Sequence, residues 1–128
     1  MRLLLDTHAF LWWVMGGDQL SPRAHAAIGN PANSCALSIA SAWEMAIKLS
    51  LGKMRLKSPL GTFLPEQLAA NGFVAHPIDL RHVARVAHLP FHHRDPFDRL
   101  LVAQALEDKL TVVSADKIFT RYRVRRVW

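Results

Sequence analysis

The sequence predicts an α/β fold built on a short, mainly parallel sheet. Short apolar runs, typical of strands buried on both faces, recur along the 128 residues, and helical segments alternate with them. This alternation indicates a parallel sheet with helices packed against it. The composition, 51% hydrophobic and 20% charged, is that of a globular protein. Because no linker, repeat or low-complexity segment interrupts the pattern, we expect a single domain over residues 1–128.

The first strand and helix are expected within residues 2–15. Leu3–Leu5 form a continuous apolar run, and Asp6 ends it. The segment after Asp6 has helical potential until residues 16–18, Gly-Gly-Asp, stop it. That helix carries three apolar residues for burial: Phe10, Leu11 and Val14.

A second strand and two helices are expected between residues 21 and 52. Ser21 and Pro22 are typical of an N-cap and a first helical residue, and open a short helix to about residue 28. Residues 34–37 form the strand candidate. Either Ser38 or Ser41 can cap the following helix, which runs to about residue 51. Its apolar stripe consists of Ala42, Met45, Ala46 and Leu49.

Residues 59–89 are expected to form two helices around a strand. Residues 59–71 form a helix closed by Gly72, and residues 73–78 a strand ended by its proline. Asp79 then caps a helix. We expect this helix to bury one side, made of Val83, Val86, Ala87 and Leu89.

The last quarter of the chain predicts a strong helix followed by a β-branched strand. Asp95 and Pro96 open the helix, which continues to about residue 109, and residues 110–114 form the strand. A small last strand is expected within residues 124–128. The buried face of the helix is Leu101, Val102, Ala105 and Leu106.

The chain has a basic charge balance. Sixteen Lys and Arg against ten Asp and Glu give a formal charge of +6, which suits nucleic acid or an acidic protein as partner; an ordinary basic surface explains it equally well. Cys35 is the only cysteine, which excludes an intrachain disulfide or a cysteine zinc cluster and fits a cytoplasmic protein. Asp6 interrupts the apolar start, which argues against a signal peptide, and no run is long enough for a membrane span.

Four acids fall where a parallel sheet can bring them together. Asp6 and Asp116 each follow a strand, at the edge where such sheets place ligands. Asp98 lies in the first turn of a helix that can begin at the same edge, and Glu44 lies inside a helix that must lean over it. Each acid also has an ordinary structural explanation: a helix cap, a helix-dipole partner, or an i,i+4 pair with Lys48. Those alternatives stay open for each residue singly.

The four acids as a set indicate a divalent-cation site. Carboxylates held close together raise each other's pKa unless a cation compensates them. Mg²⁺ binds through few carboxylates together with water and substrate phosphate. A competing metal site would use His88, His92 and His93, but these residues lack a recognised zinc spacing, and we expect them to be solvated or to act as caps.

Four segments carry a family resemblance. They are Leu-Leu-Leu-Asp-Thr-His (3–8), Ser-Ala-Trp-Glu-Met-Ala-Ile-Lys (41–48), His-Arg-Asp-Pro-Phe-Asp-Arg-Leu-Leu-Val-Ala-Gln-Ala (93–105) and Val-Ser-Ala-Asp (113–116). In this order, spanning nearly the full length, they resemble the PIN-domain ribonucleases, specifically the VapC-type toxins of bacterial toxin–antitoxin pairs. The third segment is the most specific.

The resemblance implies a three-layer α/β/α sandwich and a Mg²⁺ or Mn²⁺ site formed by Asp6, Glu44, Asp98 and Asp116. It also implies a homodimer, a cognate antitoxin that blocks the site, and RNA as substrate, with tRNA or ribosomal RNA as frequent targets.

Four further residues lie next to the acids in the sequence. Ser114 matches the family's small hydroxyl residue near the site, and we interpret Asp95 as a helix cap near the site. Arg94 and Arg99 flank the acids and either contact phosphate or only neutralise the acidic cluster.

We therefore expect a metal-dependent endoribonuclease toxin that hydrolyses RNA phosphodiester bonds. The alternative is a non-catalytic RNA- or protein-binding module on the same fold. An aspartyl-phosphate phosphatase would also place an Asp after its first strand, but it generally needs a second Asp two positions later, where this chain has His8. Trp12, Trp13 and Phe63 are expected to be mainly core, although they could also line an interface.

Overall fold

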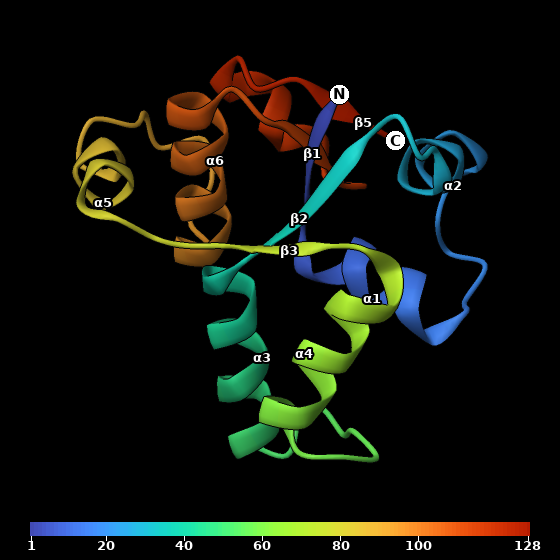
Figure 1. The fold of residues 1–128 in the computed structure, drawn as a ribbon. Coiled ribbons are helices and arrows are strands. Elements are labelled where there is room, and N and C mark those ends of the chain that lie inside the picture. The colour runs from blue at the N-terminus through green and yellow to red at the C-terminus, as the bar shows by residue number, and fades with distance from the viewer.

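The computed structural model describes all residues 1–128 and contains a five-stranded, all-parallel sheet (Figure 1). The strand order is β3-β2-β1-β4-β5. The strands are β1 (Arg2–Leu5), β2 (Ser34–Ser38), β3 (Val74–His76), β4 (Thr111–Val113) and β5 (Arg126–Val127). The predicted α/β fold with a parallel sheet is confirmed.

Six α-helices and one 3₁₀ helix connect the strands. They are α1 (Thr7–Met15), α2 (Pro22–Gly29), α3 (Ile39–Ser50), α4 (Leu60–Asn71), α5 (Leu80–Val86), α6 (Pro96–Asp108) and the 3₁₀ helix η1 (Lys117–Tyr122). Every expected helix is present, and η1 is an additional short helix between β4 and β5. No helix has both the length and the apolar character needed to cross a membrane.

The sheet separates two hydrophobic clusters, which gives three layers. Successive side chains of the central strand β1 point to opposite faces. Leu4 packs with α6 and η1 residues such as Leu101 and Phe119. Leu3 and Leu5 pack on the other face with α1, α3 and α4. Because β1 has parallel neighbours on both sides and helices on both faces, its three leucines are almost completely buried.

Ser38 is the residue that caps α3, which settles the choice between the two predicted serines. Its Oγ accepts a hydrogen bond from the N–H of Ala40 at 3.0 Å and donates to Oε1 of Gln104 at 2.5 Å. Gln104 is buried in α6. The same hydroxyl therefore begins α3 and ties it to α6 at the carboxyl end of β2.

The predicted buried side of α5 is wrong in part. Leu89 is buried and Val86 packs partly against the core, but Val83 is 53% exposed and Ala87 is not buried either. The buried residue of α5 is His82, whose ring is hydrogen-bonded to Asp108 on α6. A polar contact, and not an aliphatic stripe, therefore decides which side of this short helix faces the protein.

Candidate active site

A cavity of about 360 Å³ opens at the carboxyl edge of the sheet. All four acids predicted to converge line it: Asp6, Glu44, Asp98 and Asp116. They come from the end of β1, from α3, from the first turn of α6 and from the start of η1. Parallel strands end at the same edge, so the topology alone brings Asp6 and Asp116 together. Helices α3 and α6 begin at the same edge, and they bring Glu44 and Asp98 to the cavity.

Asp6 is both a helix cap and a buried carboxylate of this cavity. Its Oδ1 accepts a hydrogen bond from the N–H of Ala9 at 2.8 Å, which begins α1. Burial raises the pKa of Asp6, and hydrogen bonds from the Ser114 hydroxyl and the Ala9 N–H oppose that shift. Ser114 also accepts a hydrogen bond from the N–H of Asp116 at 3.0 Å. One hydroxyl thus joins the ends of β1 and β4.

Glu44 is held in place from two sides. Thr7, the first residue of α1, donates its hydroxyl to Glu44 Oε1 at 2.5 Å. Lys48, one turn further along α3, places its Nζ 3.4 Å from Oε2. The pair with Lys48 that the spacing predicted therefore exists, and it coexists with a position at the cavity wall.

The first turn of α6 supplies two acids with different roles. Asp95 is the N-cap, and its Oδ1 accepts hydrogen bonds from the N–H groups of Phe97 and Asp98 at 2.8 and 3.3 Å. Asp98 is partly buried, and burial together with the negative charge of Asp95 raises its pKa to about 7, while His93 opposes the shift. Of the four acids, Asp98 is therefore the one whose ionised form is destabilised most when no cation is bound.

His93 lies in the site among the acids, although its sequence position led us to expect only a solvated or capping histidine. Its Nε2 lies 3.0 Å from Asp98 Oδ2 and 3.1 Å from Asp116 Oδ2. Its Nδ1 accepts a hydrogen bond from the N–H of Asp95 at 3.1 Å, so the neutral ring carries its proton on Nε2, toward the two carboxylates. A signal was available, because His93 stands two residues before the N-cap of the helix that carries Asp98.

The alternative zinc site of three histidines is not formed. His92 packs its ring edge-on against Tyr122, with the ring centroids 5.0 Å apart, and His88 is exposed and belongs to no group of converging metal ligands. Only His93 of the three lies among the acids.

Arg99 does not reach the cavity, which corrects the expectation that it contacts phosphate. Its side chain is buried, and its guanidinium donates hydrogen bonds to three backbone carbonyls and to the Tyr122 hydroxyl. The carbonyls belong to Val86, Leu89 and Pro90. The guanidinium also lies over the ring of Phe91, 4.2 Å from its centroid. Arg99 makes no ion pair with any of the four acids, so it does not neutralise them either; it holds the loop before α6.

Arg94 stands beside the acidic cavity and is exposed. With Lys48 and Lys53 it lines an adjoining shallow pocket that also contacts Glu44 and Asp95. Trp12 lies half-buried at the cavity wall, where its ring stacks on His8 with the centroids 5.5 Å apart. Trp13 and Phe63 pack partly buried against the core cluster below, as expected.

The donor set fits a hard divalent cation. Four carboxylates face one cavity, and burial raises the pKa of at least two of them, Asp6 and Asp98. Lys48 and His93 are the side chains with nitrogen donors within 4.0 Å of these carboxylates. Mg²⁺ and Mn²⁺ prefer oxygen ligands, and their positive charge would offset the excess negative charge of these carboxylates.

The fold and the acidic site together define the class of protein. A sequence model of the PIN domain family matches residues 3–124, so this chain belongs to the PIN domain family. A comparison with curated proteins gives no significant match.

Solved structures of toxin–antitoxin complexes share the fold. VapBC2 from Rickettsia felis, bound to a DNA fragment from the promoter, matches with a TM-score of 0.67 and 14% identity, over 98% of this chain and 97% of the other. FitAcB from Neisseria gonorrhoeae matches with a TM-score of 0.62 and 20% identity, over 97% and 95%. VapBC-1 from nontypeable Haemophilus influenzae gives 0.55 and 12%, over 98% and 96%.

The raised pKa of Asp98 predicts that Asp98→Asn stabilises the metal-free protein at neutral pH. The folded chain holds the Asp98 proton up to a pH of about 7, whereas the unfolded chain releases it near pH 3.9. The free energy of unfolding of the wild type therefore falls as the pH rises between these values. We expect the variant to gain about 1–2 kcal/mol, or roughly 3–8 °C in Tm, above pH 7, and the gain to shrink as the pH falls toward 4.

Thermal unfolding in EDTA, from about pH 5 to about pH 8, measures this difference. Asp18→Asn is the matched control, because Asp18 is an exposed acid outside the cavity, and it should shift Tm little at any pH. A gain for Asp98→Asn that does not change with pH would contradict the proposed cause.

Proposed function

We propose that this PIN-domain protein is a metal-dependent endoribonuclease, the toxin of a toxin–antitoxin pair. The observation that carries the proposal is the convergence of Asp6, Glu44, Asp98 and Asp116 on one cavity at the carboxyl edge of the sheet. A protein gains no stability from burying like charges together, so the arrangement makes sense as a ligand site.

The residues present fit a bound Mg²⁺ or Mn²⁺. Asp6, Glu44 and Asp98 are the proposed direct ligands, and Asp116, whose side chain is 45% exposed, would act through water or with a second ion. When bound, the cation would lower the pKa of a water molecule and stabilise charge on the phosphate oxygens.

The surrounding residues orient the acids and handle protons. Thr7 fixes Glu44, and Ser114 fixes Asp6 together with the backbone of Asp116. His93 holds a proton at Nε2 between Asp98 and Asp116. Because this N–H points between two site carboxylates, His93 is the group best placed to give or take a proton beside the scissile phosphate.

Two features favour RNA as the substrate. The chain as a whole carries a formal charge of +6, and exposed Arg94 stands beside the acidic cavity as a candidate phosphate contact. The stacked rings of His8 and Trp12 offer an aromatic surface to an unstacked base, as single-stranded segments of tRNA or ribosomal RNA present. Both features support an RNA target.

We expect purified protein to cleave a mixed RNA pool with Mg²⁺ or Mn²⁺ and not with EDTA. Asp6→Asn and Asp98→Asn should each lower the rate roughly 100-fold or more, because each removes a carboxylate that would hold the cation, and the cation is what would stabilise the charge of the transition state. Asp18→Asn, the exposed control acid, should cleave as the wild type does. Equal cleavage by all four proteins would refute the assignment of the acids.

The same variants distinguish the second candidate, a non-catalytic RNA-binding module. In that case no protein cleaves RNA under any metal condition, and Asp98→Asn binds RNA as the wild type does. Introduced into inactive Asp98→Asn, Arg94→Ala should weaken RNA binding and lower its salt dependence by about one charge. Unchanged binding would remove Arg94 from the proposed phosphate contacts.

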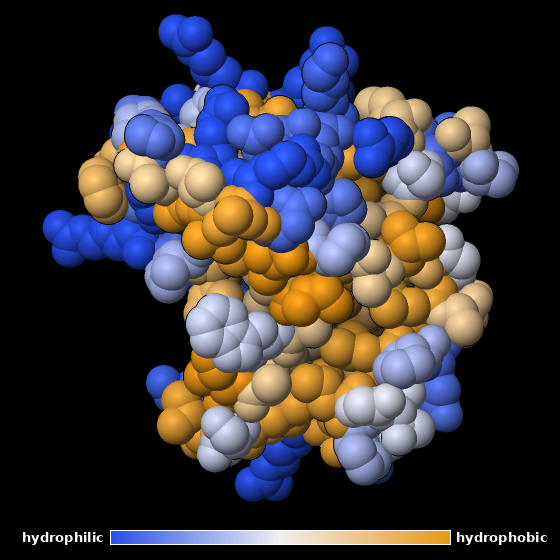
Figure 2. Space-filling model, turned by 60° about the vertical axis from the view of Figure 1, so that its left-hand side comes forward, coloured by the Kyte–Doolittle hydropathy of each residue, from blue (hydrophilic) through white to orange (hydrophobic).

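The proposed partner is an antitoxin whose chain covers the acidic cavity, with an Arg side chain presented to the carboxylates. The similar solved structures are toxin–antitoxin complexes, which supports an antitoxin partner. An apolar groove between α3 and α4, lined by residues such as Ile39, Ala42 and Leu64, offers a surface for a partner helix. Figure 2 shows hydrophobic residues gathered at the height of these helices, below a hydrophilic upper part.

Co-expression tests the partner. Expression of the chain alone should arrest growth, and co-expression of the small open reading frame beside its gene should relieve the arrest and give a co-purifying complex. Sedimentation of that complex should show two copies of this chain, as expected for a homodimer. Arrest that persists without a complex would contradict the antitoxin proposal, and a single copy would contradict the homodimer.

A further inference from the structure

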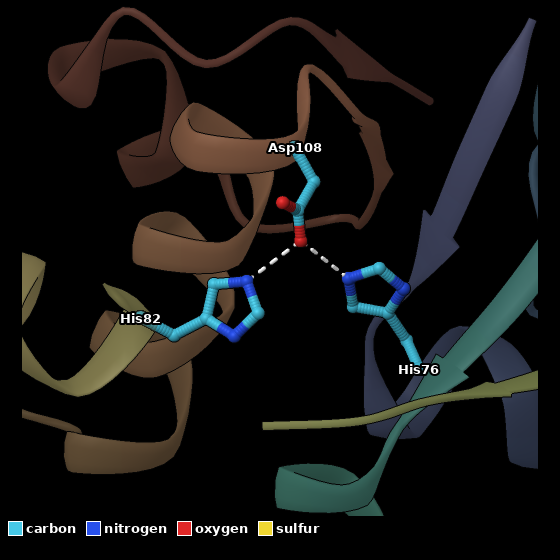
Figure 3. A group of neighbouring side chains, drawn as sticks. All are labelled: His76, His82 and Asp108. Atoms are coloured by element: carbon cyan, nitrogen blue, oxygen red, sulfur yellow. Dashed lines mark hydrogen bonds and ion pairs between the residues drawn. The ribbon is translucent and has the colours of Figure 1, made fainter. Parts of the chain in front are cut away.

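A second cluster of metal-binding side chains lies at the opposite end of α6 from the acids. His76 ends β3, His82 lies in the first turn of α5, and Asp108 ends α6 (Figure 3). Both rings point their Nε2 atoms at the same carboxylate oxygen, Asp108 Oδ2, at 2.7 Å from His76 and 2.6 Å from His82. These three atoms all lie within 4.8 Å of one another.

This cluster is separate from the candidate active site. Asp98 and Asp108 are ten residues apart in α6, which places them about 15 Å apart along the helix axis. None of the three residues lines the acidic cavity. The chemistry of the cluster is therefore independent of the nuclease proposal.

We propose that His76, His82 and Asp108 form a binding site for a divalent transition-metal ion, with Zn²⁺ the best match. Two imidazole nitrogens and one carboxylate oxygen are a recurrent three-residue set for zinc, and water completes the coordination. Mg²⁺ prefers oxygen ligands, so the two ends of α6 would select different metals.

Asp108 is prepared as a ligand through one oxygen. Arg81 donates a hydrogen bond to Oδ1 at 3.0 Å, which leaves Oδ2 to the two histidines. Oδ2 thus accepts from both rings while Oδ1 is held by Arg81, so the orientation of the carboxylate is fixed from both sides. A carboxylate ligand steadied by a neighbouring donor is a usual feature of metal sites.

His82 has a carboxylate positioned behind it. In the hydrogen-bonded state its Nδ1 accepts from the N–H of Asp79 at 3.1 Å, so its proton sits on Nε2 and faces Asp108. Metal binding needs the lone pair of Nε2, so the ring must give up its Nε2 proton to solvent and take one from solvent at Nδ1. This change breaks the hydrogen bond from the Asp79 N–H to Nδ1 and replaces it with one donated by Nδ1 to Asp79 Oδ1, 3.5 Å away. The net charge of the ring is unchanged, and a carboxylate–histidine–metal arrangement results.

The cluster is accessible to an ion. The His76 and Asp108 side chains remain 15% and 13% exposed, while His82 is almost fully buried behind them. Zinc bonds of about 2.0–2.2 Å would hold tetrahedral ligand atoms about 3.3 Å apart, so each Nε2 must move roughly 0.6 Å away from Asp108 Oδ2. Small side-chain rotations supply that movement. The bound ion would join β3, α5 and α6 at one point.

The test uses Co²⁺ as a visible probe for Zn²⁺, on the full chain carrying His93→Gln. That substitution removes the histidine from the only other group of converging ligands, His93, Asp98 and Asp116. We expect one Co²⁺ per chain to give the strong visible absorption of a four-coordinate nitrogen-ligated ion, and one equivalent of Zn²⁺ to displace it. Any Co²⁺ in the acidic cavity should absorb only weakly, because its ligands there are carboxylates and water. His88→Gln is the matched control, an exposed histidine outside the cluster, and should change nothing.

Further variants assign the signal to the cluster. His76→Gln, chosen because His76 is partly exposed and tolerant, and Asp108→Asn should each abolish the absorption. Asp79→Asn keeps a good N-cap but removes the carboxylate behind His82, and should weaken Zn²⁺ binding roughly 10–100-fold. Absence of the absorption in the parent protein, or its persistence in His76→Gln and Asp108→Asn, would overturn the proposal and leave a hydrogen-bonded network that only fixes α5 against α6.

Discussion

The burial of negative charge at the end of the central strand is the constraint on which the site depends. β1 is covered on both faces and paired on both sides, so Asp6, which follows it directly, is largely withdrawn from water. Burial raises the pKa of Asp6, and at the start of α6 burial and Asp95 together raise that of Asp98. A bound cation would offset the free energy that burying these negative charges costs, which is the reason we propose a cation site here.

Regular elements and the four acids were predictable because both follow local rules. Apolar runs, caps and proline positions placed the helices and strands, and the carboxyl edge of a parallel sheet placed Asp6 and Asp116. For Asp6, the two alternatives of the sequence analysis, a helix cap and a site carboxylate, are both realised in the same residue. It caps α1 through one oxygen while its carboxylate lines the cavity.

Long-range polar contacts were not predictable from local patterns. His93 reaches Asp116 across 23 residues, and His76 and His82 meet Asp108 across 32 and 26. No periodicity encodes such pairings. The position of Arg99 beside the acids in the sequence suggested a phosphate contact, but its guanidinium donates hydrogen bonds to backbone carbonyls of the loop before α6. Val83 looked like a core residue, yet His82 takes the buried side of α5.

The most direct test of the central claim, that the four carboxylates form one divalent-cation site, is a Mn²⁺ titration followed by electron paramagnetic resonance. Free Mn²⁺ gives a six-line signal that disappears on binding. We predict that wild-type protein and Asp18→Asn remove the signal, and that Asp6→Asn and Asp98→Asn do not. Wild-type affinity should also fall as the pH drops below about 7, where a proton competes for Asp98. Equal Mn²⁺ binding by all four proteins, or binding by none, would contradict the claim.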